Sequence, residues 1–464
     1  MEPRPLQFIV RACAGELSQA AQDTSISGVC TDSRRVQPGD IFFALVGERF
    51  DGHDFLGDVI QKAAAIVVSQ PGVQVQPGQC AVITVRDTRR ALGRFAAAYR
   101  EEFRLPVVAV GGSNGKTTTK ELIAAVLRQK LATLWSEASF NNDIGVPLTL
   151  LKLDRSHEAA VLEAGTNHPG ELEPLVRMIN PSYGVITSIG REHLEFFGDL
   201  EGVAREEAWL GEILPQKGKL FVHAEPEWVQ YIRTRTSTPI LTAGLEERND
   251  WRACDLRPDK QGLSFFVKGP VAQFSGEYRV NLLGRHQAAN ALMAIAVGVE
   301  LGISREQIEQ GLAECKPAHM RLQLWEVNGV RVLDDAYNAN ADSMLAALQA
   351  LQDMPCKGRR LAVLGDMAEL GEHSEAAHEE VGRNAAELGV GQLFVVGKMA
   401  PIMARGARSA GLARVLEFAD VEAAAIAVKS FIREGDVLLL KASRATHLER
   451  VTEWLRGRHS AGKN

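Results

Sequence analysis

The sequence lacks the features that mark several large classes of protein. No apolar run approaches the roughly 18–20 residues that span a membrane, and the N-terminal stretch MEPRPLQFIVRACAGELSQA has no apolar signal core. The six cysteines form no CxxC pair, so neither a zinc site nor a disulfide framework is predicted. Lysine and arginine form no run and the formal net charge is −6, which argues against a nucleic-acid partner. We therefore expect a cytoplasmic protein with reduced thiols.

Motifs of covalent catalysis are also missing. The sequence has no Ser-His-Asp order, no thiolate motif and no HExxH, so covalent catalysis by the protein's own side chains is not favoured. What is present is an ordinary globular composition, 45% hydrophobic and 24% charged, over 464 residues. A chain of this length exceeds one hydrophobic core and suits two to four domains.

The most informative stretch is VVAVGGSNGKTTTK at residues 107–120. A strand pattern, a glycine loop and a helix pattern follow one another, and such a loop attracts phosphate through its N–H groups and the helix dipole. Lys116 can reach the terminal phosphates, and the Thr117 hydroxyl can bind Mg²⁺. The motif departs from the full P-loop, because Val110 stands where a glycine is usual and Gly112 begins a shorter GxxGKT loop. A bare GxxGKT also occurs in ordinary turns, but the flanking strand and helix favour nucleotide binding. The predicted nucleotide-binding residues of the loop are Gly112, Ser113, Asn114, Gly115, Lys116, Thr117 and Thr118.

The alternation of strand and helix patterns predicts an α/β protein of three domains. Residues 1–103 indicate a small α/β domain, 104–316 a P-loop ATPase-like domain with a parallel sheet, and 317–464 a Rossmann-like, doubly wound domain. The expected strands or β-rich segments are 41–45, 64–68 and 81–85 in the first domain, 107–111, 160–163, 184–189, 220–223, 263–267 and 278–283 in the second, and 330–335, 361–365, 393–397 and 436–441 in the third. Helices are expected at 288–301 and 344–351, and a frayed tail at 457–464.

Polar side chains follow several expected strands of the central domain. In an open parallel sheet, the carboxyl ends of the strands form the binding crevice. Glu163 ends a strand in AAVLEAGTNHPGEL and is either a solvated carboxylate or a Mg²⁺ ligand beside the glycine loop. His193, in REHLEFFG, is either an ordinary loop residue or a metal ligand with a neutral imidazole. Asn141 and Asn142 precede a helix, where turn formation and N-capping explain them.

Further polar clusters lie later in the chain. His286 and Asn290 in GRHQAANALMA share one helical face and serve either packing or contact with a base or ribose. DDAYNANADSM and GDMAELGEHS follow expected strands, and an Asx-rich turn explains the first as well as a site does. KASRATHLE offers Lys441, Ser443 and Arg444 as an anion clamp. A phosphate cradle, Mg²⁺ ligands and cationic clamps together suit phosphoryl transfer.

These motifs together resemble the Mur ligase family of peptidoglycan synthesis over essentially the whole chain. The resemblance rests on TDSRRV, GDIFFAL and FDGHDF in the first domain, GGSNGKTTTKE, NNDIGVPLTLL, EAGTNHPGE and GRHQAANALMA in the second, and DDAYNANADSM, LGDMAELGEHSEAAH and LKASRA in the third. GDMAELGE with DDAYNAN points to the branch that adds D-Ala-D-Ala and not to the amino-acid-adding branches. The resemblance implies a UDP-sugar-binding domain, a central ATPase domain and a C-terminal domain that shapes the acceptor and nucleotide sites.

The resemblance also implies a reaction that uses ATP and Mg²⁺. ATP would phosphorylate the terminal carboxylate of UDP-MurNAc-tripeptide, and the amine of D-Ala-D-Ala would attack the acyl phosphate and release phosphate. A carboxylate is a poor electrophile, and phosphorylation gives it a good leaving group. Lys116 and Mg²⁺ would screen the repulsion between the two anions. The implied role is cytoplasmic cell-wall precursor synthesis, which serves cell shape and division, by a protein expected to act as a monomer.

Site roles carry over from the resemblance residue by residue. Lys116 would hold the β- and γ-phosphates, Thr117 and Glu163 one Mg²⁺, and His193 a second. Asn290 would contact the adenine. The remaining roles would be Arg321 and Asp335 at the ribose and phosphates, Ser33 and Arg34 near the uridine diphosphate, and Asn142, Asn338, Lys441, Ser443 and Arg444 near the substrates or the closing nucleotide face.

Three positions depart from the family pattern. Many members carry a carbamylated lysine as a ligand of the second Mg²⁺, and Glu207 stands at that place in GVAREEAW. Our hypothesis is that Glu206 or Glu207 supplies the charge directly, since carboxylate and carbamate are both hard oxygen donors; the alternative is that both are exposed helix residues. Gln287 replaces a usual asparagine, with a mild effect expected. Ala341 replaces the proline of DDxYNANP, which should loosen a turn.

Other functions remain open at this point. Another Mur ligase or a folylpolyglutamate-type ligase shares the central fold, although the folate group lacks a separate N-terminal UDP-binding domain. A P-loop kinase or GTPase is disfavoured because the sequence has no NKxD motif and three domains exceed a simple switch. A UDP-sugar-binding scaffold without turnover is a fourth reading. Three domains around one crevice also predict that the third domain closes over ATP.

Overall fold

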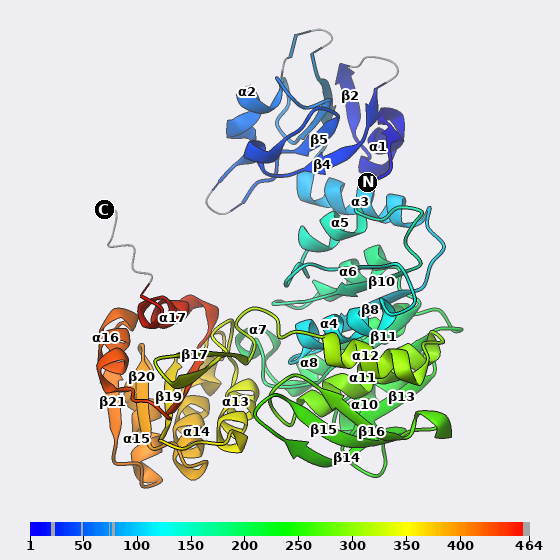
Figure 1. The fold of residues 1–464 in the computed structure, drawn as a ribbon. Helices are drawn as coiled ribbons and strands as arrows, with labels where there is room; N and C mark the ends of the chain where they lie inside the picture. The colour runs from blue at the N-terminus through cyan, green and yellow to red at the C-terminus, as the bar shows by residue number, and fades with distance from the viewer. Residues whose placement is uncertain (20–23, 48–49, 74, 77–78, 458–464) are drawn as a thin grey trace.

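Three large β-sheets organise the chain (Figure 1). The computed structural model describes residues 1–19, 24–47, 50–73, 75–76 and 79–457. The predicted α/β class with three domains is confirmed. None of the helices in these ranges is both long enough and apolar enough to cross a membrane. The tail expected at 457–464 lies outside the described residues apart from Gly457, as do Glu48 and Arg49 of the first-domain motif.

The first domain contains a five-stranded sheet in the order β2-β7-β6-β5-β4. Strands β4 to β7 run parallel, and β2 pairs antiparallel with β7. The strands are β2 (Glu16–Gln19), β4 (Gly28–Cys30), β5 (Asp40–Phe43), β6 (Ala65–Val68) and β7 (Ala81–Thr84), with β1 (Arg4–Pro5) and β3 (Ser25–Ile26) in a separate pair. The helices are α1 (Leu6–Cys13), α2 (Leu56–Val59) and α3 (Thr88–Arg100).

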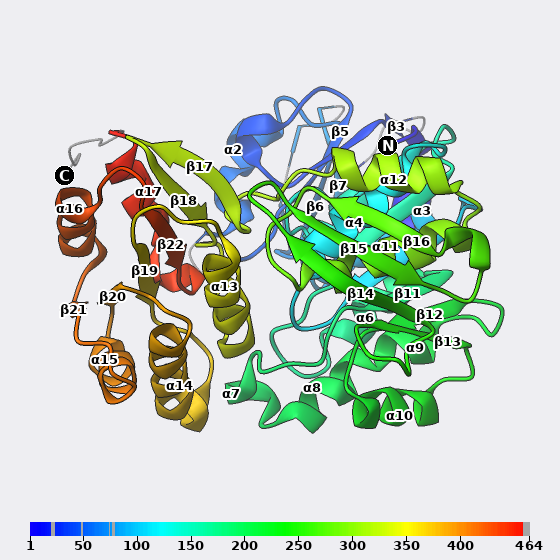
Figure 2. The same ribbon diagram turned by 60° about the horizontal axis from the view of Figure 1, so that its bottom comes forward.

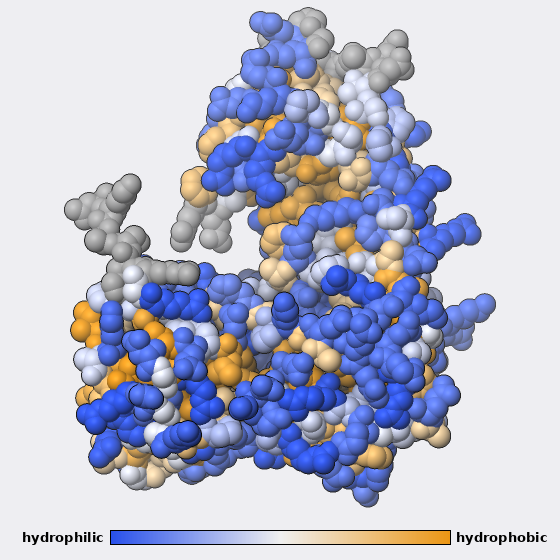
Figure 3. Space-filling model, viewed as in Figure 1, coloured by the Kyte–Doolittle hydropathy of each residue, from blue (hydrophilic) through white to orange (hydrophobic). Residues whose placement is uncertain are grey.

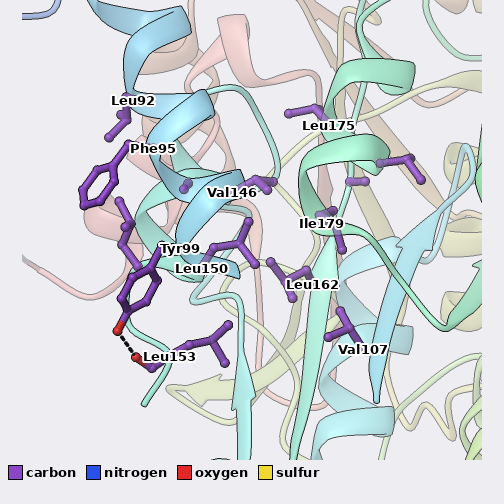
Figure 4. Packing of buried hydrophobic residues seen from close by; sticks show 14 of the residues in the cluster. Leu92, Phe95, Tyr99, Val107, Val146, Leu150, Leu153, Leu162, Leu175 and Ile179 are labelled. Atoms are coloured by element: carbon purple, nitrogen blue, oxygen red, sulfur yellow. Dashed lines mark hydrogen bonds between the residues drawn. The ribbon is translucent and has the colours of Figure 1, made fainter. Parts of the chain in front are cut away.

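Helix α3 joins the first domain to the central domain (Figure 4). It begins after Asp87, whose carboxylate accepts the Arg90 N–H at 3.0 Å and so caps the helix. Its buried Phe95 and Tyr99 belong to one apolar cluster that also contains residues of the central domain. The Tyr99 hydroxyl donates to the Leu153 carbonyl at 2.6 Å. Burial of a large apolar side chain contributes about 1.5–3 kcal/mol, so a shared core, and not a linker, sets the position of the first domain.

The central domain contains a nine-stranded sheet in the order β16-β15-β14-β13-β12-β11-β8-β10-β9. Its strands are β8 (Val107–Gly111), β9 (Thr133–Trp135), β10 (Ala159–Glu163), β11 (Tyr183–Ile186), β12 (Lys219–Val222), β13 (Ile240–Gly244), β14 (Trp251–Pro258), β15 (Leu263–Lys268) and β16 (Gly276–Val280). In this sheet order, every neighbouring pair from β9 to β14 is parallel. The pairs β14–β15 and β15–β16 are antiparallel. Because β8 lies between β10 and β11, the segments after these three strands meet at one edge.

Both faces of this sheet are covered by helices. Val108 and Val110 of β8 pack with α4 (Lys116–Leu127), α11 (Gln287–Glu300) and α12 (Arg305–Glu314), while Val107 and Ala109 belong to the cluster on the opposite face. This alternation follows from the two-residue period of a strand, and it explains why β8 is apolar throughout. The other helices of the domain are α5 (Gly145–Leu150), α6 (Leu172–Ile179), α7 (Leu194–Phe197), α8 (Leu200–Glu207), α9 (Trp209–Ile213) and α10 (Pro226–Arg235).

Strand β11 is shorter than the sequence predicts. It ends at Ile186, not at residue 189, because the next residues bind the glycine loop and not a neighbouring strand. The Thr187 hydroxyl donates to the Gly111 carbonyl at 3.0 Å, and the Ser113 N–H donates to the Ser188 carbonyl at 2.9 Å. The segment expected at 278–283 likewise ends as a strand at Val280. In the first two domains, strands β1 to β4, β9, β13 and β14 were not expected.

The third domain contains a six-stranded sheet in the order β17-β18-β22-β19-β20-β21. Its strands are β17 (Gln323–Val327), β18 (Val330–Asp334), β19 (Arg360–Gly365), β20 (Gln392–Val396), β21 (Val415–Phe418) and β22 (Val437–Lys441). All pairs are parallel except β17 with β18. Helices α13 (Ala341–Asp353), α14 (Ser374–Glu387) and α15 (Ala400–Ser409) cover one face, and α16 (Val421–Phe431) and α17 (Glu449–Leu455) the other (Figure 2). The predicted doubly wound arrangement is confirmed.

Candidate active site

A cleft of about 1990 Å³ is lined by residues of α3, the central domain and the third domain. Figure 3 shows the molecule hollowed between its first and third domains. The predicted site residues that line the cleft are Ser113, Asn114, Gly115, Lys116, Thr117, Thr118, Asn142, Glu163, His193, Asn290, Arg321, Asp335, Asn338, Lys441, Ser443 and Arg444. Gly112, Ser33, Arg34, Glu206 and Glu207 do not line it. Residues far apart in the sequence therefore converge on one cavity.

The glycine loop takes a backbone course that only glycine allows. Gly112 and Gly115 have φ angles of 107° and 87°, where side chains are disfavoured. A Cβ at Gly112 would lie 2.5 Å from the Thr187 hydroxyl oxygen, and one at Gly115 would lie 2.6 Å from Asn290 Oδ1. The residue after Gly115 begins helix α4, so the loop N–H groups and the helix N-terminus point to the same anion site.

Lys116 lies folded back on this loop. Its ammonium donates to the Gly112 carbonyl at 2.5 Å and the Ser113 carbonyl at 3.1 Å, and it lies 3.3 Å from Glu192 Oε2. Burial alone lowers the pKa of Lys116, but the carboxylates of Glu192, Glu207 and Glu163 outweigh burial and raise it. Lys116 is therefore a firmly charged donor.

Glu163 is the last residue of β10, and among the described residues only one of its two carboxylate oxygens has a hydrogen-bond partner. Its Oε1 accepts the Asn141 amide N–H at 2.8 Å, while Oε2 has no hydrogen-bond partner among the described residues although the side chain is buried. The solvated-carboxylate alternative is therefore wrong. The Thr117 hydroxyl lies nearby in the same cleft, 3.4 Å from the Ser139 hydroxyl. An unpartnered buried carboxylate oxygen is the expected donor for a hard cation.

A buried lysine holds the loop that contacts Glu163. Lys120 is fully buried in α4, and its ammonium donates to the Ser136 carbonyl at 2.6 Å and the Ala138 carbonyl at 2.8 Å. The loop continues to Asn141, which donates to Glu163. Asn142 instead caps α5, with its Oδ1 accepting the Gly145 N–H at 2.9 Å.

His193 follows Glu192 and contacts the third domain. Its Nδ1 is hydrogen-bonded to Glu369 Oε2, and its Nε2 lies 4.0 Å from Glu192 Oε2. The hydrogen bond to His193 lowers the pKa of Glu369 against the opposing effect of partial burial. His193 is mostly buried at the cleft wall, so it is not an ordinary exposed loop residue.

Glu206 and Glu207 have different partners. Glu206 accepts the N–H groups of Gly170 (2.9 Å) and Leu172 (2.8 Å), and so caps the start of α6. Glu207 Oε2 accepts the Gly112 N–H at 2.7 Å beneath the glycine loop, and its Oε1 has no partner among the described residues. Burial, which Lys116 only partly offsets, raises the pKa of Glu207 to about 8. Both side chains are buried, so the alternative of exposed helix residues is wrong.

The predicted third-domain residues form a compact cluster at the opposite wall. Lys441 donates to Asp335 Oδ2 at 2.5 Å and to the Asn338 carbonyl at 3.1 Å, and Asp335 Oδ1 accepts the Leu322 N–H at 3.0 Å. Burial lowers the pKa of Lys441, with Asp335 opposing. The Arg321 guanidinium lies 4.2 Å from the centre of the Tyr337 ring.

Other predicted residues have local partners. Asn290 accepts a hydrogen bond from the Thr119 hydroxyl (3.2 Å), and its amide donates to Gln287 Oε1 (2.8 Å). Arg444 lies 3.1 Å from Glu449. Arg34 is exposed and paired with Asp32 in the first domain. Ala341 is the first residue of α13 after the Asn340 cap, whose reciprocal bonds with Ser343 keep the turn intact without proline.

Sequence reasoning missed the side chains that support the predicted residues. These are Asn141 as the partner of Glu163, Glu192 as the partner of Lys116, Glu369 as the partner of His193, and Asn340, which donates to Asn114 at 3.0 Å. Glu192 adjoins His193 in the motif, and that adjacency was the available signal. Glu369 lies 176 residues from its partner, and nothing local reveals that contact.

The candidate donors for a metal are spread out and do not form a cage. Across the described ranges, no three His, Cys, Asp or Glu residues form a group that could hold a metal ion. This suits Mg²⁺, which uses one or two carboxylates together with substrate phosphates and water. The open oxygen of Glu163 and the Thr117 hydroxyl beside the phosphate cradle fit such a site.

Comparisons with known proteins agree with this geometry. Residues 25–100 match the Mur ligase family catalytic domain, 110–298 the Mur ligase middle domain, and 320–444 the Mur ligase glutamate ligase domain. The chain is 35% identical over 457 residues to UDP-N-acetylmuramoyl-tripeptide–D-alanyl-D-alanine ligase of Bacillus subtilis (strain 168), covering 98% of each. It is similar to the crystal structure of MurF from Acinetobacter baumannii, with a TM-score of 0.89, 32% identity and coverage of 98% and 99%. MurF ligase from Thermotoga maritima in complex with ADP gives a TM-score of 0.80, 26% identity and coverage of 93% and 97%.

Proposed function

Because this chain belongs to the Mur ligase family, we propose that it joins D-Ala-D-Ala to UDP-MurNAc-tripeptide at the expense of ATP. The product amide is a peptidoglycan precursor, made in the cytoplasm by a monomeric enzyme. The observation that carries the proposal is the meeting of the glycine loop, Lys116 and the open oxygen of Glu163 at one edge of the central sheet, in a cleft that reaches the third domain. Relatives of the same length carry the corresponding name.

The chemistry begins with two anions that must approach each other. A carboxylate oxygen of the tripeptide attacks the γ-phosphorus of ATP, the bond to the β-phosphate oxygen breaks, and ADP leaves. The charged Lys116 and the N–H groups of the loop stabilise the charge on the transferring phosphoryl group. The amine of D-Ala-D-Ala then attacks the acyl carbon, loses a proton, and expels phosphate from the tetrahedral intermediate.

Glu163 Oε2 and the Thr117 hydroxyl would hold one Mg²⁺, and His193 Nε2 would serve a second. When bound, these ions would neutralise phosphate charge and polarise phosphoryl oxygens. Between the two neighbouring glutamates, Glu207 is the better candidate for the charge that other members obtain from a carbamate. Burial raises its pKa to about 8, so a bound cation must favour its charged form. It has an open buried oxygen, whereas the oxygens of Glu206 accept the N–H groups of Gly170 and Leu172. Added bicarbonate should leave activity unchanged, and a clear gain would contradict this role.

The remaining residues bind substrate. Arg321 reaches the phosphates by leaving the Tyr337 ring, and Asp335 lies on the same cleft wall for the ribose. Asn290 contacts the adenine. Ser33 and Arg34 hold the uridine diphosphate on the first domain, and Asn142, Asn338, Lys441, Ser443 and Arg444 surround the acceptor dipeptide or the nucleotide.

A matrix of phosphate-release assays tests the proposal. ATP is supplied with UDP-MurNAc-tripeptide, with D-Ala-D-Ala, with both or with neither, and the products are identified by mass spectrometry. We expect phosphate and a new amide only when both substrates are present, and neither with Lys116→Ala. A stable phosphorylated product would indicate a kinase. Release without substrates would indicate an NTPase, and no release would indicate a binding protein.

A further inference from the structure

The contact between His193 and Glu369 crosses from the central domain to the third domain. His193 precedes α7, and Glu369 lies in the loop between β19 and the short 3-10 helix Gly371–His373. The Glu195 N–H donates to the Glu369 carbonyl at 3.1 Å, while the Glu369 carboxylate meets His193 Nδ1. One residue of the third domain is thus fixed by its backbone and its side chain to the segment that carries His193.

Both residues of this pair have strained backbones. His193 has a φ of 49° and Glu369 a φ of 60°, in the left-handed region that residues other than glycine rarely adopt. Histidine enters this region more readily than most residues, but glutamate has no such preference, so the conformation of Glu369 is not a local preference. Such strain persists where the surrounding structure enforces it, and it gathers at functional sites. The strain here places two particular side chains against each other across the domain boundary.

The hydrogen bond selects one form of the imidazole. A carboxylate can only accept, so Nδ1 must carry the proton, and the neutral ring then has its lone pair on Nε2. In metal sites, a carboxylate on the far nitrogen of a histidine commonly fixes the tautomer and the ring orientation of the ligand. Glu192 Oε2, which also approaches Lys116, lies 4.0 Å from Nε2.

We propose that Glu369 is a positioning residue that sets His193 in the Nδ1–H tautomer, so that Nε2 can bind a cation only when the third domain is docked as it is here. The inference rests on the proposed function for its metal, but the tautomer itself needs neither substrate nor metal. Docking would then complete the metal site, which links closure of the third domain to phosphoryl transfer.

Removal of Glu369 need not undock the domains. Arg191 binds Asp342 at 2.7 Å and Glu380 at 2.6 Å across the same boundary, and Asn340 donates to Asn114 at 3.0 Å. A Glu369 variant therefore changes the environment of His193 while these contacts remain. Glu372, exposed in the adjoining 3-10 helix, provides a matched control.

The test uses the full chain labelled with ¹⁵N-histidine, with the His193 signals assigned by comparison with His193→Asn. In the wild type without ligands, we expect the neutral imidazole to carry its proton on Nδ1 and not on Nε2. Glu369→Ala should move the population toward the Nε2–H form, Glu369→Gln should shift it less because an amide oxygen still accepts, and Glu372→Gln should leave it unchanged. An Nε2–H form in the wild type, or an unaltered tautomer in Glu369→Ala, would overturn the proposal.

Metal dependence gives the second readout. The Mg²⁺ concentration for half-maximal phosphate release should rise by about 10-fold or more in Glu369→Ala, and stay near the wild-type value in Glu372→Gln. An unchanged Mg²⁺ requirement would also overturn the proposal. If the wild type makes no amide at all, the proposed function fails, and the tautomer measurement still decides the role of Glu369.

Discussion

Two clusters of buried charge face the same cleft and are built in different ways. At the edge of the central sheet, Glu163 keeps one oxygen without a partner among the described residues. In the third domain, Asp335 and Lys441 bind each other at 2.5 Å, and backbone groups satisfy both further. A buried charge without a partner costs stability, whereas a paired one does not need a ligand. The difference indicates that the first cluster is arranged for an incoming ligand, whereas the second holds its own shape at the cleft wall before any substrate arrives.

The largest effect is expected when the charged side chain of Lys116 is removed from the first cluster, which also contains Glu163. Lys116→Ala should reduce turnover by on the order of 10³-fold, because a charged donor at the transferring phosphoryl group is lost. Steady-state phosphate release with both substrates measures this, and circular dichroism checks the fold. Turnover within a few fold of wild type would place the phosphate site elsewhere and remove the basis of the comparison.

Breaking the paired cluster should cost stability. Lys441→Met leaves Asp335 charged and buried without its partner, so the free energy of unfolding should fall by about 3–5 kcal/mol. Denaturant unfolding measures the loss. Asp335→Asn combined with Lys441→Met is the matched variant, since it removes both charges and should recover much of the loss. A loss below about 1 kcal/mol for Lys441→Met would mean that the third-domain pair is not a structural unit.

For Glu163 the same argument predicts that stability is kept and turnover is lost. Glu163→Gln keeps an acceptor for Asn141 and removes a buried charge, so the free energy of unfolding should equal or exceed that of wild type. Turnover should fall by about 10²-fold, because a carboxylate aimed at developing charge or its counter-ion is lost. The free energy of unfolding and the turnover should be measured on one preparation, so that the two changes can be compared directly. A destabilised variant with normal turnover would reverse the assignment of the two clusters.

His378 is a third buried polar group, and it can form its hydrogen bonds as a neutral ring. His378 accepts the Met367 N–H on Nε2 at 2.9 Å and lies 2.7 Å from the Ser374 carbonyl through Nδ1, so the neutral ring makes both bonds. Burial lowers the pKa of His378 below its ordinary value of 6.5, and Ser374 and Asp366 oppose this only in part. This ring supports the loop that contains Glu369, so its protonation bears on the domain contact.

The sign of the pH effect follows from that lowered pKa. Below about pH 6.5 the unfolded chain binds a proton that the folded chain resists. The stabilisation is therefore complete above that pH and is lost as the pH falls toward the lower folded-state pKa. Unfolding curves of wild type and His378→Gln across this range should converge at low pH. Parallel curves would show that His378 does not titrate on unfolding.

Local pattern predicted the parts of the site that are continuous in sequence. The strand, glycine loop and helix around Lys116 formed as expected, and Glu163 was correctly placed at the end of its strand. The order of the sheet then explains why these residues meet, since β8 lies between β10 and β11. Residues 187–189 were mistaken for strand because nothing in the local sequence reveals the hydrogen bonds that they make to the glycine loop.

Long-range contacts were beyond local pattern. Glu206 and Glu207 adjoin in one helix, yet one caps α6 and the other lies beneath the glycine loop. Only the packing of α8 against these two partners separates their roles. The predicted nucleotide and acceptor residues Asp335 and Lys441 were placed in the cleft correctly, but their pairing depends on the register of β18 with β22. Contacts of this kind are hard to predict because the two partners lie far apart in the sequence, and not because their own motifs are weak.

The central claim is that the site around Lys116 and Glu163 activates the terminal carboxylate of the tripeptide by phosphorylation. The direct test uses UDP-MurNAc-tripeptide with ¹⁸O in its terminal carboxylate, together with ATP and D-Ala-D-Ala. If the acyl phosphate forms, one ¹⁸O atom must pass to the inorganic phosphate, and mass spectrometry of that phosphate should find it in every turnover. Amide formation with unlabelled phosphate would contradict the account.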